Sequence, residues 1–226
     1  MINKNYTEPI LKGIKEGDQI GGPFELAKIL SESLVSNNSF KEEDLRARYL
    51  TWWKSDAFDT GPTYASVFSK IDKGMDPSVA VKTVHKEFGY NTAGCGPAHR
   101  ATPLAGILNI PTDQLITIAR HEAKITHFDS DAGNGSAIVI LLCRYLLEGN
   151  SYQDAQKLIS ENLELKESWI NIKKANLKPD GYIFNVIHSA LYFIENNKSL
   201  KDTFKFAGKA NYCPIIFSVI NACISR

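Results

Sequence analysis

The sequence predicts an all-α fold, and three observations support this class. Apolar residues recur at helical spacing through most of the 226 residues. No stretch of useful length alternates apolar and polar residues, as half-buried strands do. Hydrophobic residues make up 43% of the chain and charged residues 23%, a balance that allows one large core. We therefore predict a compact helical protein in which residues 1–226 form a single domain.

In the first part of the chain, turns that contain glycine or proline separate the predicted helices. The first helix passes through Ile10 and Ile14 and stops at Gly17. Side chains that can accept hydrogen bonds from free backbone N–H groups mark later starts. Asp76 precedes a proline at the first helical position, and Ser39 lies ahead of two glutamates that would complete a capping box. The further helices are predicted at residues 24–35, 41–53, 64–71 and 77–88.

Two polar segments then interrupt the helical pattern. They are residues 91–103 (NTAGCGPAHRATP) and 126–136 (THFDSDAGNGS). Glycine costs extra backbone entropy inside a helix, and proline lacks the amide hydrogen that a helix needs. We therefore predict that the helices break at both segments and that the breaks shape a pocket. Two ordinary turns between helices are the alternative.

The helical pattern returns between and after these segments. Thr112 is placed to cap a helix over residues 114–124, and Ser151 is placed to cap a later helix. Residues 166–179 are less regular. The other helices are predicted at residues 135–147, 182–194, 200–207 and 214–224.

Charge and cysteine usage limit the classes of partner. Lysine and arginine number 26 against 25 acidic residues, so the net charge of +1 predicts neither nucleic-acid binding nor an anionic membrane partner. The four cysteines form no C-x-x-C pair, which indicates a reducing compartment. No apolar run has the length of a signal peptide or a membrane span. We expect a soluble, cytoplasmic protein, although export by a specialised route would leave no mark of this kind.

Seven motifs occur in the order in which one family has them: GDQIGGPFE, LSESL, RYLTWW, FDTGPT, AGCGPAHRATPLA, ARHEAKITHFD and GYIFNVIHSALYFI. From about Ile10 to Cys223 the sequence resembles the ADP-ribosylglycohydrolase family, which includes the hydrolase that acts on dinitrogenase reductase and the J1 crystallins. The resemblance implies a compact all-helical fold. It also implies a central cleft that holds ADP-ribose and, in active members, two magnesium ions.

The resemblance carries over a set of ligand-binding residues. The family's G-N-G-x-x-M-R-x-x-P motif falls on residues 94–103, where cysteine replaces the asparagine and histidine replaces the methionine. Its T-H-x-D motif falls on residues 126–129. Backbone amides of such a glycine-rich loop can bind phosphate or ribose oxygens. The predicted ligand-binding residues are Gly94, Cys95, Gly96, His99, Arg100, His127, Asp129 and Tyr212.

Two of these residues have alternative interpretations. His127 lies at a helix end, where a histidine often serves as a capping cation and not as a ligand contact. Cys95 lies between two glycines and could act as a nucleophile if a neighbouring charge stabilised its thiolate. A small packed thiol is the simpler interpretation of Cys95.

The metal-binding motifs of the family are the part that this sequence lacks. Active members carry a Thr-Asp-Asp-Thr loop after the first motif, but here Glu25 runs directly into LAKILSESL. The family's second aspartate cluster falls on residues 208–213, where Ala210 and Tyr212 replace the aspartates and Lys209 adds a positive charge. Magnesium is held by carboxylates and waters, so we predict that the magnesium pair is lost and that no other cofactor is bound.

Three functions remain open at this point. The first is a metal-independent hydrolase of a glycosidic ADP-ribosyl or nucleotide-like bond, with Glu25, Asp59 and Asp131 as its catalytic carboxylates. The second is an inactive relative that binds ADP-ribose or a related nucleotide. The third is a structural or interaction protein, as the crystallin relatives suggest. The expected partner is an ADP-ribose-like or nucleotide-like small molecule, or an ADP-ribosylated protein.

Overall fold

The computed structural model describes residues 4–208, 210 and 212–225. Every regular element in these residues is a helix, so the predicted all-α class is confirmed. The only strand-like pairing among them is an isolated antiparallel bridge between Gly94 and Tyr182. No helix in these ranges is both long enough and apolar enough to cross a membrane.

The helices follow one another in a simple order along the chain. They are α1 (Lys4–Gly17), α2 (Gly22–Asn37), α3 (Glu42–Asp56), α4 (Pro62–Asp72), α5 (Pro77–Glu87), α6 (Gly96–Arg100), α7 (Leu115–Lys124), α8 (Ser130–Leu147), α9 (Tyr152–Glu161), α10 (Lys166–Lys173), α11 (Ile183–Glu195), α12 (Leu200–Ala207) and α13 (Tyr212–Ile224). Two short 3₁₀ helices, η1 (Thr102–Gly106) and η2 (Thr112–Gln114), precede α7.

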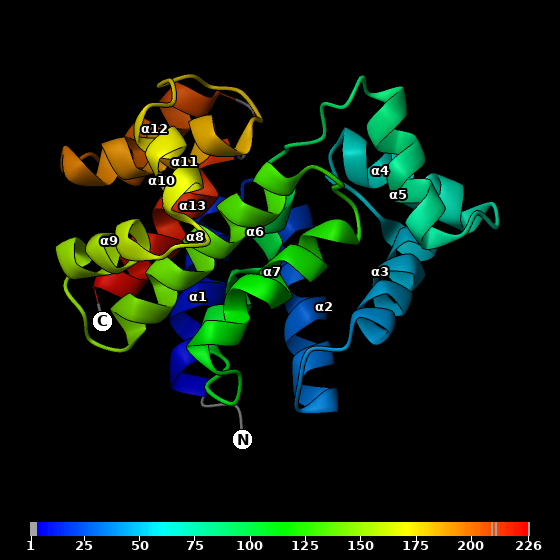
Figure 1. The fold of residues 1–226 in the computed structure, drawn as a ribbon, viewed down its shortest axis with the longest axis horizontal. Helices are drawn as coiled ribbons and strands as arrows, with labels where there is room; N and C mark the ends of the chain where they lie inside the picture. The colour runs from blue at the N-terminus through cyan, green and yellow to red at the C-terminus, as the bar shows by residue number, and fades with distance from the viewer. Residues whose placement is uncertain (1–3, 209, 211, 226) are drawn as a thin grey trace.

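Helix α8 lies at the centre of this array, and nearly all of its residues are buried. Figure 1 shows α2 to α5 on one side of α7 and α8, and α9 to α12 on the other side. A helix that is apolar around its whole circumference needs neighbours on every side. Helices α7, α9, α11 and α13 provide those contacts, together with η1 and α6. The buried apolar residues form one continuous cluster around α8.

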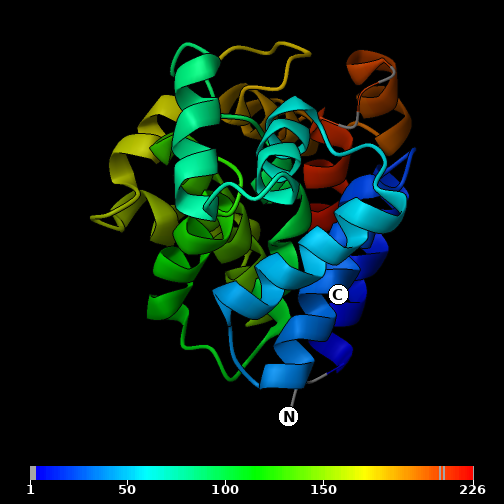
Figure 2. The same ribbon diagram turned by 90° about the vertical axis from the view of Figure 1, so that its right-hand side faces the viewer.

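Helices α1 and α13 pack against each other at unusually close range, and Figures 1 and 2 both show them side by side. Two glycines of α1 make this approach possible. A Cβ at Gly13 would lie 2.8 Å from the Cα of Val219, and a Cβ at Gly17 would lie 2.5 Å from the Cα of Ile215. Because real Cβ atoms do not come that close to a backbone, only glycine fits these two positions.

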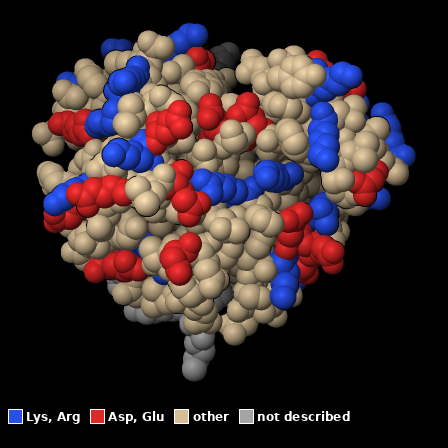
Figure 3. Space-filling view, in the orientation of Figure 1, with Lys and Arg blue, Asp and Glu red and all other residues tan. Residues whose placement is uncertain are grey.

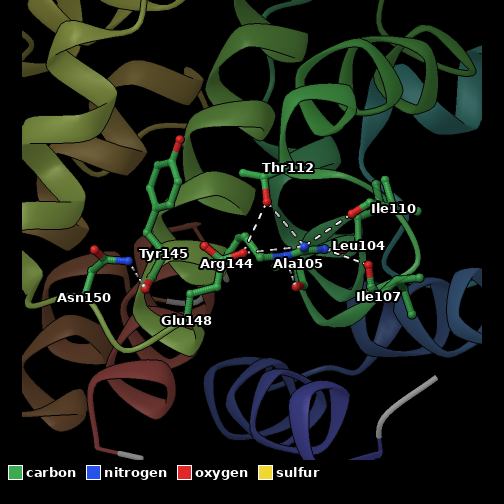
Figure 4. A network of polar contacts seen from close by, with 9 residues as sticks. All are labelled: Leu104, Ala105, Ile107, Ile110, Thr112, Arg144, Tyr145, Glu148 and Asn150. Carbon is green, nitrogen blue, oxygen red and sulfur yellow. Dashed lines mark hydrogen bonds and ion pairs between the residues drawn. The ribbon is translucent and has the colours of Figure 1, made fainter. Parts of the chain in front are cut away.

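The connection between α6 and α7 is held by a buried arginine of α8. Arg144 is 2% exposed, and its guanidinium donates hydrogen bonds to four backbone carbonyl oxygens of this connection. The shortest two bonds, to Ala105 and Ile107, are both 2.7 Å long. Figure 4 shows the guanidinium surrounded by these carbonyl groups, with Thr112 and Glu148 beside them. The arginine thus supplies the hydrogen-bond donors that an irregular buried segment lacks.

Two of the predicted helix caps match the structure, and two do not. The carboxylate of Asp76 and the hydroxyl of Ser151 accept backbone hydrogen bonds at the starts of α5 and α9, as predicted. The predicted cap at Ser39 is wrong, because its hydroxyl donates to the carbonyl of Asn37 and α3 begins after Lys41 without a side-chain cap. Thr112 does not cap α7 either, because it lies inside η2 and its hydroxyl donates to Glu148.

The two predicted breaks are shorter than expected. In the first segment, residues 91–95 are not helical, and residues 96–100 form the single-turn helix α6. In the second segment, residues 126–129 are not helical, and α8 begins at Ser130. The carboxylate of Asp129 accepts a hydrogen bond from the Asp131 amide and caps α8. Gly135 lies inside α8, where the side chain of Ile183 on α11 packs so closely that a Cβ would overlap it. This close packing explains why a glycine occupies the middle of a helix.

Candidate functional site

A cavity of about 440 Å³ lies where segments from several parts of the chain meet. Its volume is within the range of sites that hold small molecules. Seven predicted site residues line it: Asp59, Gly94, Cys95, Gly96, His99, His127 and Tyr212. A groove of about 630 Å³ between α1, α12 and α13 is larger but contains none of the predicted residues. The convergence of glycines and imidazoles makes the smaller cavity the candidate site.

The glycine-rich wall of the cavity is fixed to the start of α11. The amide of Cys95 donates to the carbonyl of Gly181, and the amide of Ile183 donates to the carbonyl of Ala93, each at 3.0 Å. These two bonds flank the isolated bridge between Gly94 and Tyr182. The non-helical backbone of residues 93–95 is therefore hydrogen-bonded to residues 181–183, and these bonds hold the glycine-rich loop in the cavity wall.

His127 lies directly behind the two glycines of this wall. A Cβ at Gly94 would be 3.0 Å from Nε2 of His127, and a Cβ at Gly96 would be 3.4 Å from its Cε1. The ring is 4% exposed, and burial, together with the nearby charge of Arg100, lowers the pKa of His127 well below its usual value. His127 is therefore a neutral imidazole at the cavity and not a capping cation.

A buried ion pair supports His127 from the side away from the cavity. The guanidinium of Arg100 donates from Nε to the carboxylate of Glu122 at 2.6 Å and from Nη2 to the hydroxyl of Thr126 at 2.9 Å. That hydroxyl lies 2.7 Å from Nδ1 of His127. The phenol of Tyr49 also donates to Glu122, at 3.2 Å. Arg100 therefore does not line the cavity, but through Thr126 it helps to hold the ring of His127 in place.

His99 lies in the cavity wall on α6. Its Nε2 is 2.8 Å from the carbonyl oxygen of Tyr212, which links α6 to the start of α13. Burial lowers the pKa of His99 to about 4, although its hydrogen bond to Tyr212 opposes this shift. The imidazole of His99 is therefore neutral at physiological pH.

The structure distinguishes between the two interpretations of Cys95. The side chain is 7% exposed, and burial raises the pKa of the thiol to about 12. A thiol with this pKa stays protonated at neutral pH, whereas a nucleophilic cysteine must be a thiolate. The geometry supports the packed thiol, because Cys95 belongs to the buried apolar cluster of the core.

Four of the predicted site residues lie outside the cavity lining, and Arg100 is one of them. The carboxylate of Glu25 pairs with Lys28 at 2.7 Å on the surface of α2. Asp129 caps α8, and Asp131 accepts a 2.9 Å hydrogen bond from the phenol of Tyr182. Burial raises the pKa of Asp131, while its bond to Tyr182 lowers it. Of the three predicted catalytic carboxylates, only Asp59 lines the cavity.

Some residues of the site were not singled out from the sequence. The cavity is also lined by Ile20, Pro23, Thr60, Gly61, Pro62, Thr63, Tyr64 and Gly181, and by Ala210, which the sequence indicated only as the replacement of a metal-binding aspartate. Most of them belong to the GDQIGGPFE and FDTGPT motifs, so their motif membership was the available signal. Glu122 was also missed, although a carboxylate beside Leu115, Ile116, Ala119 and Ala123 on the buried face of α7 indicates a buried partner.

The donor set of the cavity does not fit the family's magnesium pair. Asp59 is the one carboxylate among its described lining residues, and Ala210 offers no side-chain oxygen. Lys209 and Asn211, which also fall on the second motif, lie outside the described residues. Elsewhere in the described ranges, no group of three or more histidine, cysteine, aspartate or glutamate side chains could hold a metal ion. Two magnesium ions require several carboxylates, which these residues do not supply.

Figure 3 shows that acidic and basic side chains alternate over the face it presents, without a large area of one sign. Such a face offers no extended basic track for a nucleic-acid backbone. The cavity itself is lined by neutral groups and one carboxylate among its described residues. A small molecule of low or moderate charge therefore suits this site better than a polyanion.

Comparisons with known proteins agree with this architecture. The family model described as ADP-ribosylglycohydrolase matches residues 12–210. A solved structure described as an "ADP-ribosylglycohydrolase-related protein complex" superimposes with a TM-score of 0.74, covering 98% of this chain and 87% of that chain at 18% sequence identity. At this identity the likeness shows the fold alone. No curated protein sequence matches the chain.

Proposed function

The chain belongs to the ADP-ribosylglycohydrolase family, and from this premise we propose that it binds an ADP-ribose-like or nucleotide-like small molecule without magnesium and without hydrolysing it. The ligand occupies the cavity between Gly94, His127 and Tyr212. An ADP-ribosylated protein could present the same group at the mouth of the cavity. This proposal selects the binding protein over the metal-independent hydrolase.

One observation carries the choice: Asp59 is the one carboxylate among the described residues that line the cavity. Cleavage of a glycosidic bond without a metal needs two carboxyl groups that flank it, one as the acid and one as the base or nucleophile. Glu25 pairs with Lys28 on α2, and Asp131 pairs with Tyr182, so neither of them supplies the second group from the cavity wall. The neutral state of His99 and His127 also argues against acid catalysis by an imidazolium.

The remaining features of the cavity favour ligand binding. Hydroxyl groups of Thr60 and Thr63 and the ring of Tyr64 join the two imidazoles in its lining. A few polar groups set among apolar walls are typical of small-molecule sites. A purely structural protein gains nothing from burying two neutral histidines next to an open cavity, because each costs solvation free energy. The crystallin-like alternative is therefore less favoured.

Calorimetric titration of the purified chain with ADP-ribose, with and without magnesium, tests this proposal. We expect micromolar binding that does not depend on magnesium and that weakens in His127→Phe, which keeps a ring of similar size. His121→Gln is the matched control, because His121 is exposed on α7 and lies outside the cavity lining. Binding that requires magnesium, or no binding to ADP-ribose, would contradict the proposal.

A parallel assay measures release of ADP-ribose from an ADP-ribosylated protein. We expect no release above the uncatalysed rate over the time in which the same protein is saturated with ADP-ribose. Release that disappears in Asp59→Asn would instead establish the hydrolase. The two assays together therefore distinguish a binding protein, an enzyme and a structural protein.

A further inference from the structure

Both histidines of the cavity are held in a defined tautomer. A carbonyl oxygen can only accept hydrogen bonds, so the Nε2 of His99 that lies 2.8 Å from the Tyr212 oxygen must carry the proton. Because the ring is neutral, its Nδ1 is then an acceptor. No residue in the described part of the chain donates to this Nδ1. His99 therefore contributes a hydrogen-bond acceptor to the site.

The second histidine is fixed from the opposite nitrogen. The hydroxyl oxygen of Thr126 already accepts a hydrogen bond from Arg100, whose guanidinium has no acceptor. The acceptor within reach of the hydroxyl's own proton is Nδ1 of His127, at 2.7 Å. The neutral ring therefore carries its proton on Nε2, the atom that faces Gly94. His127 contributes a hydrogen-bond donor to the site.

We propose that His99 and His127 act as an acceptor and a donor pair that recognises a sugar hydroxyl group, so that the cavity holds the neutral ribosyl part of the ligand and not a phosphate. A hydroxyl group can accept from one imidazole and donate to the other, which no phosphate oxygen can do when ionised. The inference rests on the proposed function and goes further, because it assigns the chemical group that is bound and the two residues that select it.

The charges around the cavity agree with this assignment. Its described lining contains no lysine or arginine, and its one charged side chain is the carboxylate of Asp59. Arg100 is near, but it is 2% exposed and its guanidinium is engaged by Glu122 and Thr126. Phosphate recognition commonly uses cationic side chains, and the described lining has none. A glycine-rich loop can also present backbone amides, but the Cys95 amide of this loop already donates to Gly181. The phosphates of a nucleotide would therefore lie outside the cavity.

His99 is also where this chain departs from the family pattern, in which methionine occupies the position. The substitution replaces a thioether, which is a weak acceptor, with an imidazole that bonds to Tyr212 and keeps one nitrogen available. His99→Met is therefore an informative variant. It removes the strong acceptor while the position keeps a side chain that related proteins accommodate.

Nitrogen-edited NMR of the histidine side chains tests the tautomers in the free protein. We expect the protonated Nε2 form for both rings at neutral pH. Thr126→Val removes the hydroxyl that fixes His127, so a mixture of tautomers should appear at His127 alone, and Thr126→Ser should restore the single form. A Nδ1-protonated form of either ring in the unmodified protein would overturn the inference, independently of any ligand.

Ligand recognition is tested with D-ribose and inorganic pyrophosphate as separate probes in the same NMR experiment. Ribose should shift the side-chain resonances of His99 and His127, and pyrophosphate should leave them unchanged. The affinity for ADP-ribose should fall about 3- to 10-fold in His99→Met and in His127→Phe, as expected for one lost neutral hydrogen bond. His121→Gln should bind as tightly as the unmodified protein.

The outcomes separate this inference from the proposed function. Tight ADP-ribose binding that neither variant weakens would overturn the hydroxyl recognition while the proposed function stands. Shifts caused by pyrophosphate would assign the cavity to phosphate and would have the same effect. Absence of binding to ADP-ribose and ribose alike would overturn both.

Discussion

Among the described residues, Arg100 and Arg144 are buried to the same extent, each with 2% of its surface exposed, yet their surroundings differ in kind. Arg100 is paired with a fully buried carboxylate, that of Glu122, and lies over the rings of Tyr49 and Tyr64 at 5.5 and 5.8 Å. Arg144 bonds to backbone carbonyls of the connection between α6 and α7. Arg100 compensates a fully buried charge, whereas Arg144 mainly satisfies backbone carbonyls, and its ion pair with the part-exposed Glu148 is longer, at 3.7 Å.

This difference in surroundings determines whether a substitution of the arginine affects only stability or also the candidate site. The partners of Arg144 belong to an irregular segment, and none of them lines the cavity. The second partner of Arg100 is Thr126, which contacts the cavity histidine His127. We therefore expect changes at Arg144 to alter stability alone, and changes at Arg100 to alter both stability and the site.

The largest effect is expected from Arg100→Met, because it leaves the buried carboxylate of Glu122 without a counter-charge. Breaking a buried ion pair in this way costs about 3–5 kcal/mol of unfolding free energy. Urea denaturation measures the loss. Arg100→Met/Glu122→Leu removes both charges and should be clearly more stable than the single variant. Equal instability of the two variants would show that the packing of Arg100 matters more than its charge.

Arg144→Met should cost slightly less, about 3–4 kcal/mol, because it leaves mainly polar carbonyl groups without partners, and the one carboxylate it leaves, that of Glu148, is 39% exposed and can be solvated. No second substitution can remove backbone carbonyls, so this loss should not be rescued in the way the Arg100 loss is. Urea denaturation again gives the value, and ADP-ribose affinity should be unchanged in the folded protein. Lys157→Met is the surface control, because its side chain is 70% exposed and pairs only with Glu161 at 3.9 Å among the described residues, with an expected cost below about 1 kcal/mol. A loss of affinity in Arg144→Met would contradict the separation of the two regions.

Acid should destabilise the region of Arg100 and not that of Arg144. The folded-state pKa of His99 is about 4, below its usual value, so the unfolded chain binds a proton that the folded chain excludes. The stability of the folded protein is unaffected by this group above about pH 6.5 and falls as the pH falls toward 4, and the loss of unfolding free energy reaches about 2 kcal/mol at pH 5. His127, whose pKa is also lowered, acts in the same direction.

The measurement for this prediction is the free energy of unfolding at pH 7 and pH 5. His99→Met should lose less stability between the two pH values than the unmodified protein. Arg144→Met should keep the pH dependence of the unmodified protein between these values, because the short hydrogen bonds of Arg144 go to backbone carbonyls, which do not titrate, and its ion pair with the part-exposed Glu148 is long, at 3.7 Å. If His99→Met loses as much stability between pH 7 and pH 5 as the unmodified protein, a group other than His99 takes up the proton on unfolding.

The smallest effect is expected at the two glycines of the cavity wall. A Cβ at Gly94 would be 3.0 Å from Nε2 of His127, so Gly94→Ala should displace the ring, weaken ADP-ribose binding and cost about 1 kcal/mol. Gly96→Ala is the matched control, because its Cβ would be 3.4 Å from the same ring and fits more easily. Thermal unfolding and calorimetry compare the two variants. Stronger effects in Gly96→Ala would mean that the ring is oriented differently.

The helices were predictable because their signals are local. Apolar spacing identified α2, α11 and α13, and single side chains such as Asp76 and Ser151 identified helix starts. The start of α8 was misjudged, because the fit of Gly135 beneath Ile183 depends on a helix far away in the sequence. Propensity describes a residue by itself, whereas packing decides whether a glycine is tolerated.

The candidate site was predictable only through the family motifs. They placed Gly94, His99 and His127 together, which the cavity lining reproduces. They did not indicate that Arg100 faces inward, because its partner Glu122 belongs to another helix and its burial follows from the tertiary fold. The side-chain tautomers depend on Thr126 and on the Tyr212 carbonyl, and contacts of this kind have no sequence pattern.

Helix α1 packs on α13 through Gly13 and Gly17, so α1 completes its packing only after α13 has been synthesised. Contacts between distant segments form slowly, because a long loop must be closed. Until α13 is available, part of the cover over Ile10 and Ile14 is missing, and apolar surface of this kind is prone to aggregation. We therefore expect the yield of folded protein to depend on how quickly α13 docks on α1, in addition to the stability of the final fold.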